Sequence, residues 1–326
     1  MTSIARVILL AAIIGPGTYA CRQESSTAPA SPTADLTSQA LGGDAVFTTI
    51  HLPGSSFTTA RDINAQGEIV GRYGGADNHT HGYLRSPDGT FTSIDVPGAN
   101  LTAALGINSR HEIVGASRFP GEPGATRHGF VLTADGFTTF DFPGATFTFP
   151  QGINRRGDIV GQYIIAGVTH GFLLRDGSYT TIDFPGAGLT VAWRINRRGQ
   201  IVGGYTDAGG NNHFYLLSEG EFATVDLPGD PQAFLETGGI NARGDIVGSY
   251  CDSKPCTTAS LDTHGFLLSQ GEFTRIDVPG FFGPVAFSIN ARGDIIGNYC
   301  QDSGCTLPAL GFVLSRGGQE QAEEDD

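Results

Sequence analysis

One nine-residue motif recurs six times along the chain, and it constrains the fold more than any other feature. Its pattern is Ile-Asn-x-x-Gly-x-Ile-Val-Gly, and residues 195–203 are one copy. Asn and Gly tolerate positive φ in a tight turn, while the flanking Ile and Val favour strands. Successive copies lie 42 to 49 residues apart, and such a period, filled with strands and turns, predicts a β-propeller. The motif residues are Asn64, Asn108, Asn154, Asn196, Asn241 and Asn290.

The composition of the 326 residues also favours an all-β fold. The 48 Gly and 17 Pro suit many short strands joined by turns, and 39% hydrophobic residues can form a substantial core. After the N-terminus, no window keeps the apolar spacing of a helix. The third repeat shows the expected strands a to d at residues 147–153, 158–163, 170–174 and 179–184. Four antiparallel strands make one blade, so six periods predict a six-bladed β-propeller.

The turn between strands c and d predicts a register that can be checked by counting. Asp176-Gly177 is a strong signal for a type I′ hairpin, which places His170 opposite Asp183. We expect a charge-assisted hydrogen bond between these side chains. Because every repeat needs such residues, we predict that they satisfy buried polar groups and perform no chemistry. The corresponding pairs are His128 with Asp141, His213 with Asp226, His264 with Asp277, and His81 with Asp95.

The two ends of the repeat array are complementary. The sixth repeat ends after a strand c at residues 310–314, while residues 47–52 have the pattern of a strand d with no blade before them. We predict that the N-terminal strand joins the last blade and closes the ring. In this blade alone, Leu310 replaces the strand-c His and His51 replaces the strand-d Asp.

A His-Gly-Phe triplet opens strand c in several repeats, as in residues 128–130, 170–172 and 264–266, with His81-Gly82-Tyr83 and His213-Phe214-Tyr215 as variants. Together with the Ile-Asn turn, this pattern resembles the HAF-type extracellular repeat proteins of bacteria, named for a His-Ala-Phe triplet. The resemblance extends over about residues 46–316. It implies export and a propeller-forming repeat fold, and it implies no shared activity.

The N-terminal segment indicates export. Residues 1–20 combine Arg6 with a short apolar run, which is typical of a secretion signal and too short to span a bilayer. Tyr19-Ala20-Cys21 resembles a bacterial lipobox, so lipidation of Cys21 and plain cleavage are both open. Residues 21–45 are expected to form a flexible tether. We therefore expect either a lipoprotein of the cell envelope or a secreted protein.

Four of the five cysteines form two pairs at the same point of neighbouring repeats. Cys251 with Cys256 and Cys300 with Cys305 suit two local disulfides, although two adjacent loops could also be cross-linked. A metal site is the competing interpretation, and it would need close His or Cys partners. No cofactor motif was found, and we expect no cofactor or metal.

The chain is acidic, with a formal net charge of −14 and a single lysine, Lys254. This charge argues against nucleic acid and anionic membrane surfaces as partners and leaves membrane attachment only through a lipid anchor. Residues 317–326 contain five acidic residues and are predicted to be a disordered tail.

Variation among the repeats predicts where a ligand binds. The b–c and d–a connections differ most in length, and in a propeller they emerge on the same face. Along strand a, which lines the channel, the candidate ligand-binding residues are Arg61, Gln151, Trp193, Arg194 and Glu236. Trp193 with its polar neighbour could hold a sugar or a cation. In the alternative interpretation, Trp193 fills a gap between blades.

No catalytic motif is present, so no catalytic residue is predicted. The leading hypothesis is a monomeric, non-catalytic propeller that binds an extracellular glycan or protein. A rival is a hydrolase or lyase that uses Arg61, Asp62, Trp193, Arg194 and Glu236 around the channel mouth. A purely structural envelope protein is the third hypothesis.

Overall fold

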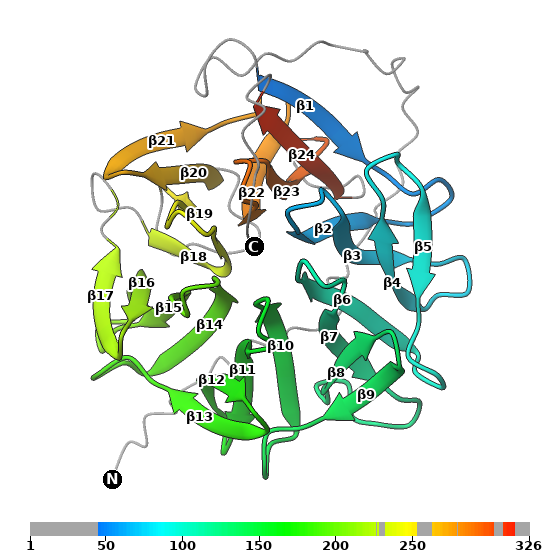
Figure 1. Ribbon diagram of the computed structural model, residues 1–326, viewed down its shortest axis with the longest axis horizontal. Helices are drawn as coiled ribbons and strands as arrows, with labels where there is room; N and C mark the ends of the chain where they lie inside the picture. The colour runs from blue at the N-terminus through cyan, green and yellow to red at the C-terminus, as the bar shows by residue number, and fades with distance from the viewer. Residues whose placement is uncertain are drawn as a thin grey trace, which may run out of the picture.

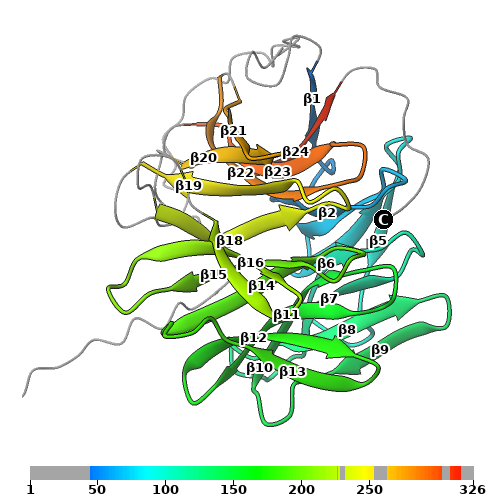
Figure 2. The same ribbon diagram turned by 60° about the vertical axis from the view of Figure 1, so that its left-hand side comes forward.

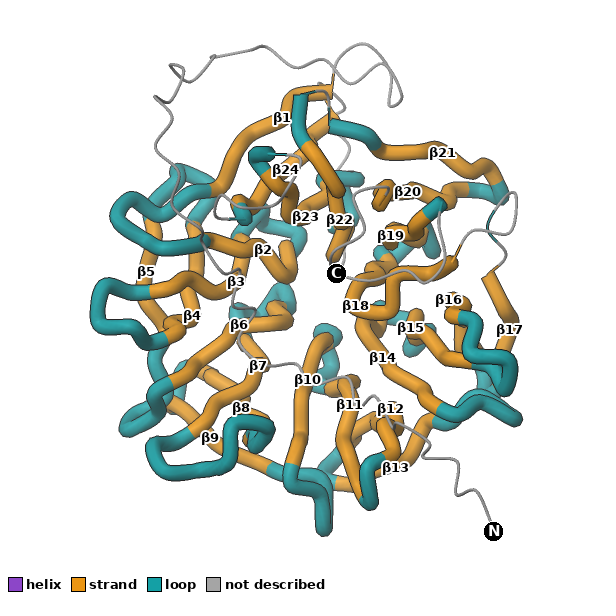
Figure 3. The backbone as a smooth tube through the Cα atoms, turned by 180° about the vertical axis from the view of Figure 1, so that it is seen from behind, coloured by secondary structure: helices purple, strands orange, loops and turns teal. Residues whose placement is uncertain are grey.

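The computed structural model describes residues 45–225, 227, 232–252, 263–278, 280–302 and 309–316. All regular structure in these ranges is β-strand, and 24 strands surround a central axis (Figures 1 and 3). Within the same ranges, no helix is long and apolar enough to cross a membrane. The prediction of an all-β propeller is confirmed.

Each repeat supplies four strands that run outward from the axis in the order a to d (Figure 1). Strands a are β2 (Thr58–Ile63), β6 (Leu101–Ile107), β10 (Phe147–Ile153), β14 (Leu189–Ile195), β18 (Gln232–Ile240) and β22 (Phe282–Ile289). Strands b are β3 (Ile69–Gly74), β7 (Ile113–Arg118), β11 (Ile159–Ile165), β15 (Ile201–Thr206), β19 (Ile246–Cys251) and β23 (Ile295–Cys300). Strands c are β4 (Thr80–Arg85), β8 (His128–Thr133), β12 (Val168–Arg175), β16 (Asn212–Ser218), β20 (Thr263–Ser269) and β24 (Leu310–Arg316). Strands d are β5 (Phe91–Ile94), β9 (Gly136–Phe140), β13 (Ser178–Ile182), β17 (Glu221–Val225), β21 (Glu272–Ile276) and, for the sixth repeat, β1 (Ala45–Ile50).

The strands form four sheets of four strands and one sheet of eight, seen from the side in Figure 2. The third, fourth and fifth repeats are separate sheets, and β1 joins β22–β24. The eight-stranded sheet contains the first and second repeats, which are joined through one parallel pair, Thr80 with Leu101. Because neighbouring strands within a repeat are antiparallel, the a–b and c–d turns share one face and the b–c and d–a connections share the other.

The predicted closure is confirmed. β1 pairs antiparallel with β24, with Phe47 opposite Leu314 and Ile50 opposite Gly311. The Phe47 ring stacks on Phe312 with centroids 5.4 Å apart. The N-terminal strand therefore supplies the strand d that the sixth repeat lacks.

The hydrophobic core lies between neighbouring sheets, and strand-c aromatic rings cover the motif glycine of strand b at Gly71, Gly115, Gly203, Gly248 and Gly297. Phe130 is fully buried, and a Cβ on Gly115 would lie 2.7 Å from its Cζ atom. Only glycine fits at this position. The motif glycine after Ile and Val is therefore explained by packing.

The c–d hairpin of the third repeat has the predicted register, with Leu174 opposite Tyr179 and Arg175 opposite Ser178. Asp176 and Gly177 both have positive φ, as a type I′ turn requires. His170 Nδ1 lies 2.9 Å from Asp183 Oδ1. The same contact occurs in the pairs His81 with Asp95, His128 with Asp141, and His264 with Asp277, whereas Asp226 lies outside the described residues.

The prediction that these pairs are buried is wrong. The Asp183 side chain is 49% exposed and that of His170 is 26% exposed. The pairs lie at the ends of strands c and d, beside the b–c and d–a connections, where solvent reaches the carboxylate. They join two strands at the surface and do not satisfy core groups.

The a–b turn differs from expectation in one respect. Positive φ occurs at its glycine, as at Gly67 and Gly199, and at His111 in the second repeat, but at none of the six Asn residues. The Asn is required for its side chain instead. Its Oδ1 accepts a hydrogen bond from the backbone N–H four residues later, at 2.9–3.1 Å in all six copies.

The six Asn side chains also connect the repeats in a closed ring. Each Nδ2 donates to the side chain four residues later at 2.7–2.9 Å. Each Nδ2 also donates to the backbone carbonyl of the Asn in the next repeat at 3.0–3.4 Å. The last of these bonds runs from Asn290 back to Asn64. We call this arrangement the Asn ring.

Replacing one ring residue by its carboxylate analogue tests the ring. Asn196→Asp keeps the acceptor oxygen but removes both donors, so the Gln200 amide oxygen loses this hydrogen bond and the Asn241 carbonyl retains the one from the Gly244 N–H. We expect the free energy of unfolding in urea to fall by about 1–3 kcal/mol, because unmet buried polar groups cost this much. Asn212→Asp is the control, since Asn212 accepts through its oxygen. Equal losses in both variants would contradict the role of the ring.

Candidate functional site

An ion pair crosses the central axis between strands of the first and fourth repeats. Arg194 Nε donates to Asp62 Oδ1 at 3.3 Å, and both side chains are buried. The same guanidinium donates to the carbonyls of Gln151, Trp193 and Arg61. Asp62 also accepts from Ser288 Oγ at 2.5 Å and from the Ile107 N–H at 2.9 Å. Arg194 therefore ties strands a together, and with Asp62 it also lines a small pocket at the axis.

The other predicted channel residues do not form one site. The Arg61 guanidinium lies over the Phe287 ring, 4.3 Å from its centroid, between the first and sixth repeats. Gln151 Nε2 reaches Gln162 Oε1 of the same sheet at 3.5 Å. The Glu236 side chain lies outside the described residues. Of the set proposed for a hydrolase or lyase, Asp62 and Arg194 come together at the axial pocket, whereas the side chains of Arg61 and Trp193 pack between repeats.

Trp193 fills space between the fourth and fifth repeats, as its alternative interpretation predicted. It is 1% exposed, and its ring meets Phe214 edge to face with centroids 5.3 Å apart. A Cβ on Gly238 would lie within 2.8 Å of Trp193 Cζ3, so the ring occupies the space left by that glycine. A fully buried indole packs the interface and cannot stack on a ligand.

Truncation of this indole tests the packing role. We expect Trp193→Ala to lower the free energy of unfolding by about 3–5 kcal/mol, as large-to-small changes in cores do. Phe282→Ala serves as the control, because Phe282 is 39% exposed. A Trp193→Ala protein as stable as the control variant would contradict burial between repeats.

Histidines on the face of the b–c and d–a connections lie between two carboxylates. His81 Nδ1 is 2.7 Å from Asp95 Oδ1, and its Nε2 is 3.1 Å from Asp77 Oδ1. The ring also stacks on Tyr73. His128 has the same arrangement with Asp141 and Glu122, and His264 with Asp277 and Asp252. Across the described residues, no group of three or more His, Cys, Asp and Glu side chains could hold a metal ion.

The carboxylates raise the pKa values of two of these histidines, His81 and His128. Burial lowers the pKa of His81, but its hydrogen bonds with Asp77 and Asp95 outweigh burial, so the pKa is raised above its ordinary value. The pKa of His128 is raised in the same way by Asp141 and Glu122. A raised pKa in the folded state means that folding favours the protonated ring.

This shift has a defined sign in a pH titration. We expect His81 and His128 to titrate above about 6.5 in NMR spectra of the native protein. Their contribution to stability should be complete below that pH and lost as the pH rises through the folded-state pKa. Asp77→Asn should lower the pKa of His81 and leave that of His128 unchanged. Titration of native His81 at or below 6.5 would contradict the assignment.

The described structure also has a groove between the fourth and fifth repeats, which the sequence interpretation missed. Its volume is about 500 Å³, within the range of small-molecule sites. The a–b and c–d turns of the fifth repeat form one wall, so the groove lies toward the face opposite the b–c connections. The lining residues are Leu216, Ala223, Thr224, Val225, Arg243, Gly244, Asp245, Ile246, Leu268, Gln270 and Gly271.

Two small residues of β17 make room for this groove. Ala223 stands where the other strands d have Thr48, Thr92, Thr138, Thr180 and Thr274. Val225 stands where they have Ile50, Ile94, Phe140, Ile182 and Ile276. No other repeat has residues as small as Ala and Val at these two positions. This departure is visible in the sequence, but its meaning depends on knowing that these side chains face the next repeat.

A larger residue in β16 accompanies the two small ones. Phe214 occupies the position that the glycine Gly171 has in strand c of the third repeat. A Cβ on Gly171 would lie 3.5 Å from Ala192 of the next repeat. The Phe214 ring instead packs on Phe266 with centroids 5.1 Å apart. β18 of the fifth repeat also departs from regular pairing between Ala233 and Gly238. The junction between these two repeats is therefore packed differently from the others.

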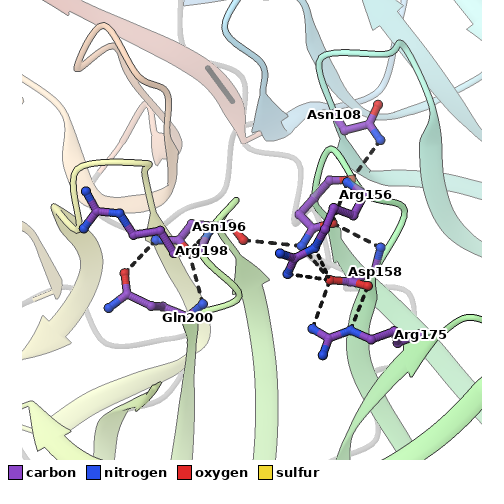
Figure 4. A network of polar contacts seen from close by, with 8 residues as sticks. Asn108, Arg156, Asp158, Arg175, Asn196, Arg198 and Gln200 are labelled. Carbon is purple, nitrogen blue, oxygen red and sulfur yellow. Dashed lines mark hydrogen bonds and ion pairs between the residues drawn. The ribbon is translucent and has the colours of Figure 1, made fainter. Parts of the chain in front are cut away.

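Arginines lie on the third and fourth a–b turns, where Figure 4 shows Arg156 and Arg198. A small pocket of about 50 Å³ opens there, lined by Arg155 and Arg197 together with Asn108, Asn154 and Asn196. In the third repeat, Asp158 receives hydrogen bonds from both Arg156 and Arg175 at 2.9–3.1 Å. In the fourth repeat the equivalent residue is Gln200, a neutral side chain, beside Arg198.

The predicted disulfides are tested only in part. Cys251 is buried at the end of β19, and Cys300 ends β23. Each of these two cysteines has an interaction partner. Cys256 and Cys305 lie outside the described residues, as does Cys21. The two local pairings and the lipidation of Cys21 therefore stay predictions.

Comparisons with solved structures support the propeller fold. The chain is similar to AofleA from Arthrobotrys oligospora, with 13% identity, coverage of 87% of this chain and 90% of that one, and a TM-score of 0.55. It is also similar to TolB from Acinetobacter baumannii, with 11% identity, coverage of 86% and 65%, and a TM-score of 0.50.

These similarities concern the fold alone, because a propeller is shared by proteins of many functions. No family model matches the chain, and no curated protein sequence matches it.

Proposed function

We propose that this protein is an exported, non-catalytic, six-bladed propeller that binds a segment of another protein in the groove between the fourth and fifth repeats. The groove is the observation on which the proposal rests. It lies at the junction where strands c and d depart together from the repeat, through Phe214, Ala223 and Val225.

The count of six blades has two supports. The first and second repeats each have four strands in antiparallel order, and a single parallel pair merges them into one sheet. The Asn ring also passes through six repeats before it returns to Asn64. We therefore count the eight-stranded sheet as two blades.

The lining of the groove favours a protein segment over a glycan. Its floor is aliphatic, with Leu216, Ile246 and Leu268, and no aromatic ring lines it to stack on a sugar. Arg243 lines it too, and its side chain is 52% exposed. An apolar side chain beside an Asp or Glu would fill the groove and pair with this guanidinium.

Peptide selection tests the groove directly. A library of displayed 12-residue peptides, selected on the purified protein, should yield sequences with Leu, Ile or Phe next to Asp or Glu. Val225→Phe should reduce binding of the selected peptides at least tenfold by filling the groove, and it should fold, because Phe140 occupies the same position in the second repeat.

Val168→Phe is the matched control for this experiment. Val168 is 42% exposed on β12, away from the groove, so its replacement should leave binding unchanged. Peptides that bind both variants equally, or binding to a glycan array with no peptide selected, would overturn the proposal.

The absence of catalysis is supported by the placement of the channel residues. Arg61 and Trp193 lie between repeats, and Asp62 is paired with Arg194. A panel of hydrolase and lyase substrates offered to the purified protein should show no turnover. Turnover that Glu236→Gln abolishes would establish the rival hypothesis instead.

The remaining features of the proposal come from the sequence. Residues 1–20 direct export, Cys21 carries a lipid anchor or marks a cleaved N-terminus, and the cysteine pairs 251–256 and 300–305 form local disulfides. The resemblance to HAF-type repeat proteins supports this assignment to the cell exterior. We expect a monomer.

A further inference from the structure

We propose that the bound segment adds as a further strand to the outer edge of β17, with every second side chain entering the groove. This inference rests on the proposed function and assigns the conformation of the partner, an extended chain that pairs through its own main chain. β17 is the edge strand of its sheet, which has the order β14-β15-β16-β17, and it lies on the outside of the fourth repeat (Figure 1).

The hairpin register decides which main-chain groups of β17 face outward. The two-residue turn at 219–220 has positive φ at both positions, and Ser218 lies opposite Glu221 across it. The pair that flanks such a turn is hydrogen-bonded, and hydrogen-bonded pairs then alternate with non-hydrogen-bonded pairs along the strands. The N–H and C=O groups of Phe222 and Thr224 therefore point away from β16.

These four main-chain groups are accessible to an added strand. Among the described residues, no strand pairs with the outer edge of β17, and no turn or loop hydrogen bond uses the main chain of Phe222 or Thr224. Ala223 and Thr224 are exposed at this edge. An added strand accepts hydrogen bonds from the two N–H groups and donates to the two carbonyls, as peptides do when they bind by strand addition.

The groove is continuous with this edge. Val225 packs against the hydrophobic cluster that contains Phe266 of the fifth repeat, so Ala223 and Val225 face that repeat. The Thr224 hydroxyl lies on the opposite face of the sheet, 3.1 Å from Tyr205 Oη, yet Thr224 also lines the groove. Thr224 therefore lines the groove through its main chain. A strand that pairs with this main chain has one row of side chains over the groove.

The groove determines which side chains the added strand carries. Leu216 and Leu268 line the groove, so apolar side chains at alternate positions of the segment fit it. Arg243 lines it too, and its side chain is 52% exposed although Nε donates to Asp245 at 2.9 Å. Asp245 is buried beneath this guanidinium. The charge that solvent reaches is therefore positive, and an acidic side chain in the segment complements it.

Amide hydrogen exchange in the wild-type protein tests the strand addition. The probe is a selected 12-residue peptide whose binding Val225→Phe weakens. In its complex, the Phe222 and Thr224 amides should exchange at least about tenfold more slowly, because hydrogen-bonded amides are protected. Tyr179 and Thr181 are the matched internal controls, since they have the same positions in the β13 hairpin, and their exchange should not change.

Two proline variants test the same contact through affinity. Thr224→Pro removes one outward N–H, and Pro is tolerated on an edge strand where the N–H faces solvent. It should weaken peptide binding about tenfold, because one hydrogen bond is lost and the ring blocks the added strand. Thr181→Pro should leave binding unchanged. It is the matched control, because each variant loses one hydroxyl contact, to Tyr163 for Thr181 and to Tyr205 for Thr224.

N-methylation of the peptide, one residue at a time, makes the test independent of how the proline variants fold. In an added strand, alternate N–H groups face β17, so binding should fall at every second residue and persist at the residues between them.

Unchanged exchange at Phe222 and Thr224 overturns the strand addition, as does an N-methyl scan without alternation. Equal binding by folded Thr224→Pro and Thr181→Pro overturns it too. Each of these results leaves the proposed function standing as long as Val225→Phe weakens binding. If no peptide is selected, or if Val225→Phe has no effect, the proposed function is wrong and the strand addition is wrong with it.

Discussion

The hydrogen bonds of the six Asn side chains hold the fold together at its axis. Each amide satisfies two requirements at once: its oxygen accepts the N–H groups of its own turn, and its nitrogen donates to the next repeat. A buried amide of this kind is stabilising only when all of its groups are paired, which makes it specific for one geometry. The ring therefore fixes both the shape of each turn and the placement of neighbouring repeats.

The packing between neighbouring repeats can vary at positions outside the Asn ring. The junction of the fourth and fifth repeats keeps its ring bond from Asn196 to Asn241, yet its outer part is packed around Phe214 and opens into a groove. In a close-packed core, a larger or smaller residue must be compensated by its neighbour. We regard the paired substitution of one large and two small residues as the origin of the groove.

Charge is distributed unevenly over the two faces. On one face, histidines lie between carboxylates and favour protonation, as His81 does. On the other, four of the a–b turns pair an arginine with a carboxylate of the same turn, at Arg110, Arg156, Arg243 and Arg292, whereas the fourth turn has the neutral Gln200 instead.

The sequence by itself determined the repeat, the strand order, the hairpin register and the closure of β1 on β24, because turn chemistry and strand alternation act over a few residues. The sequence also predicted that Asp183 lies opposite His170. It did not predict that the pair is exposed, since exposure depends on which residues cover the end of a strand. Only the tertiary structure decided the roles of Arg61, Trp193 and Arg194, which became interface and axis residues when the repeats met. The groove also depends on the tertiary structure, because side chains of two different repeats form its walls.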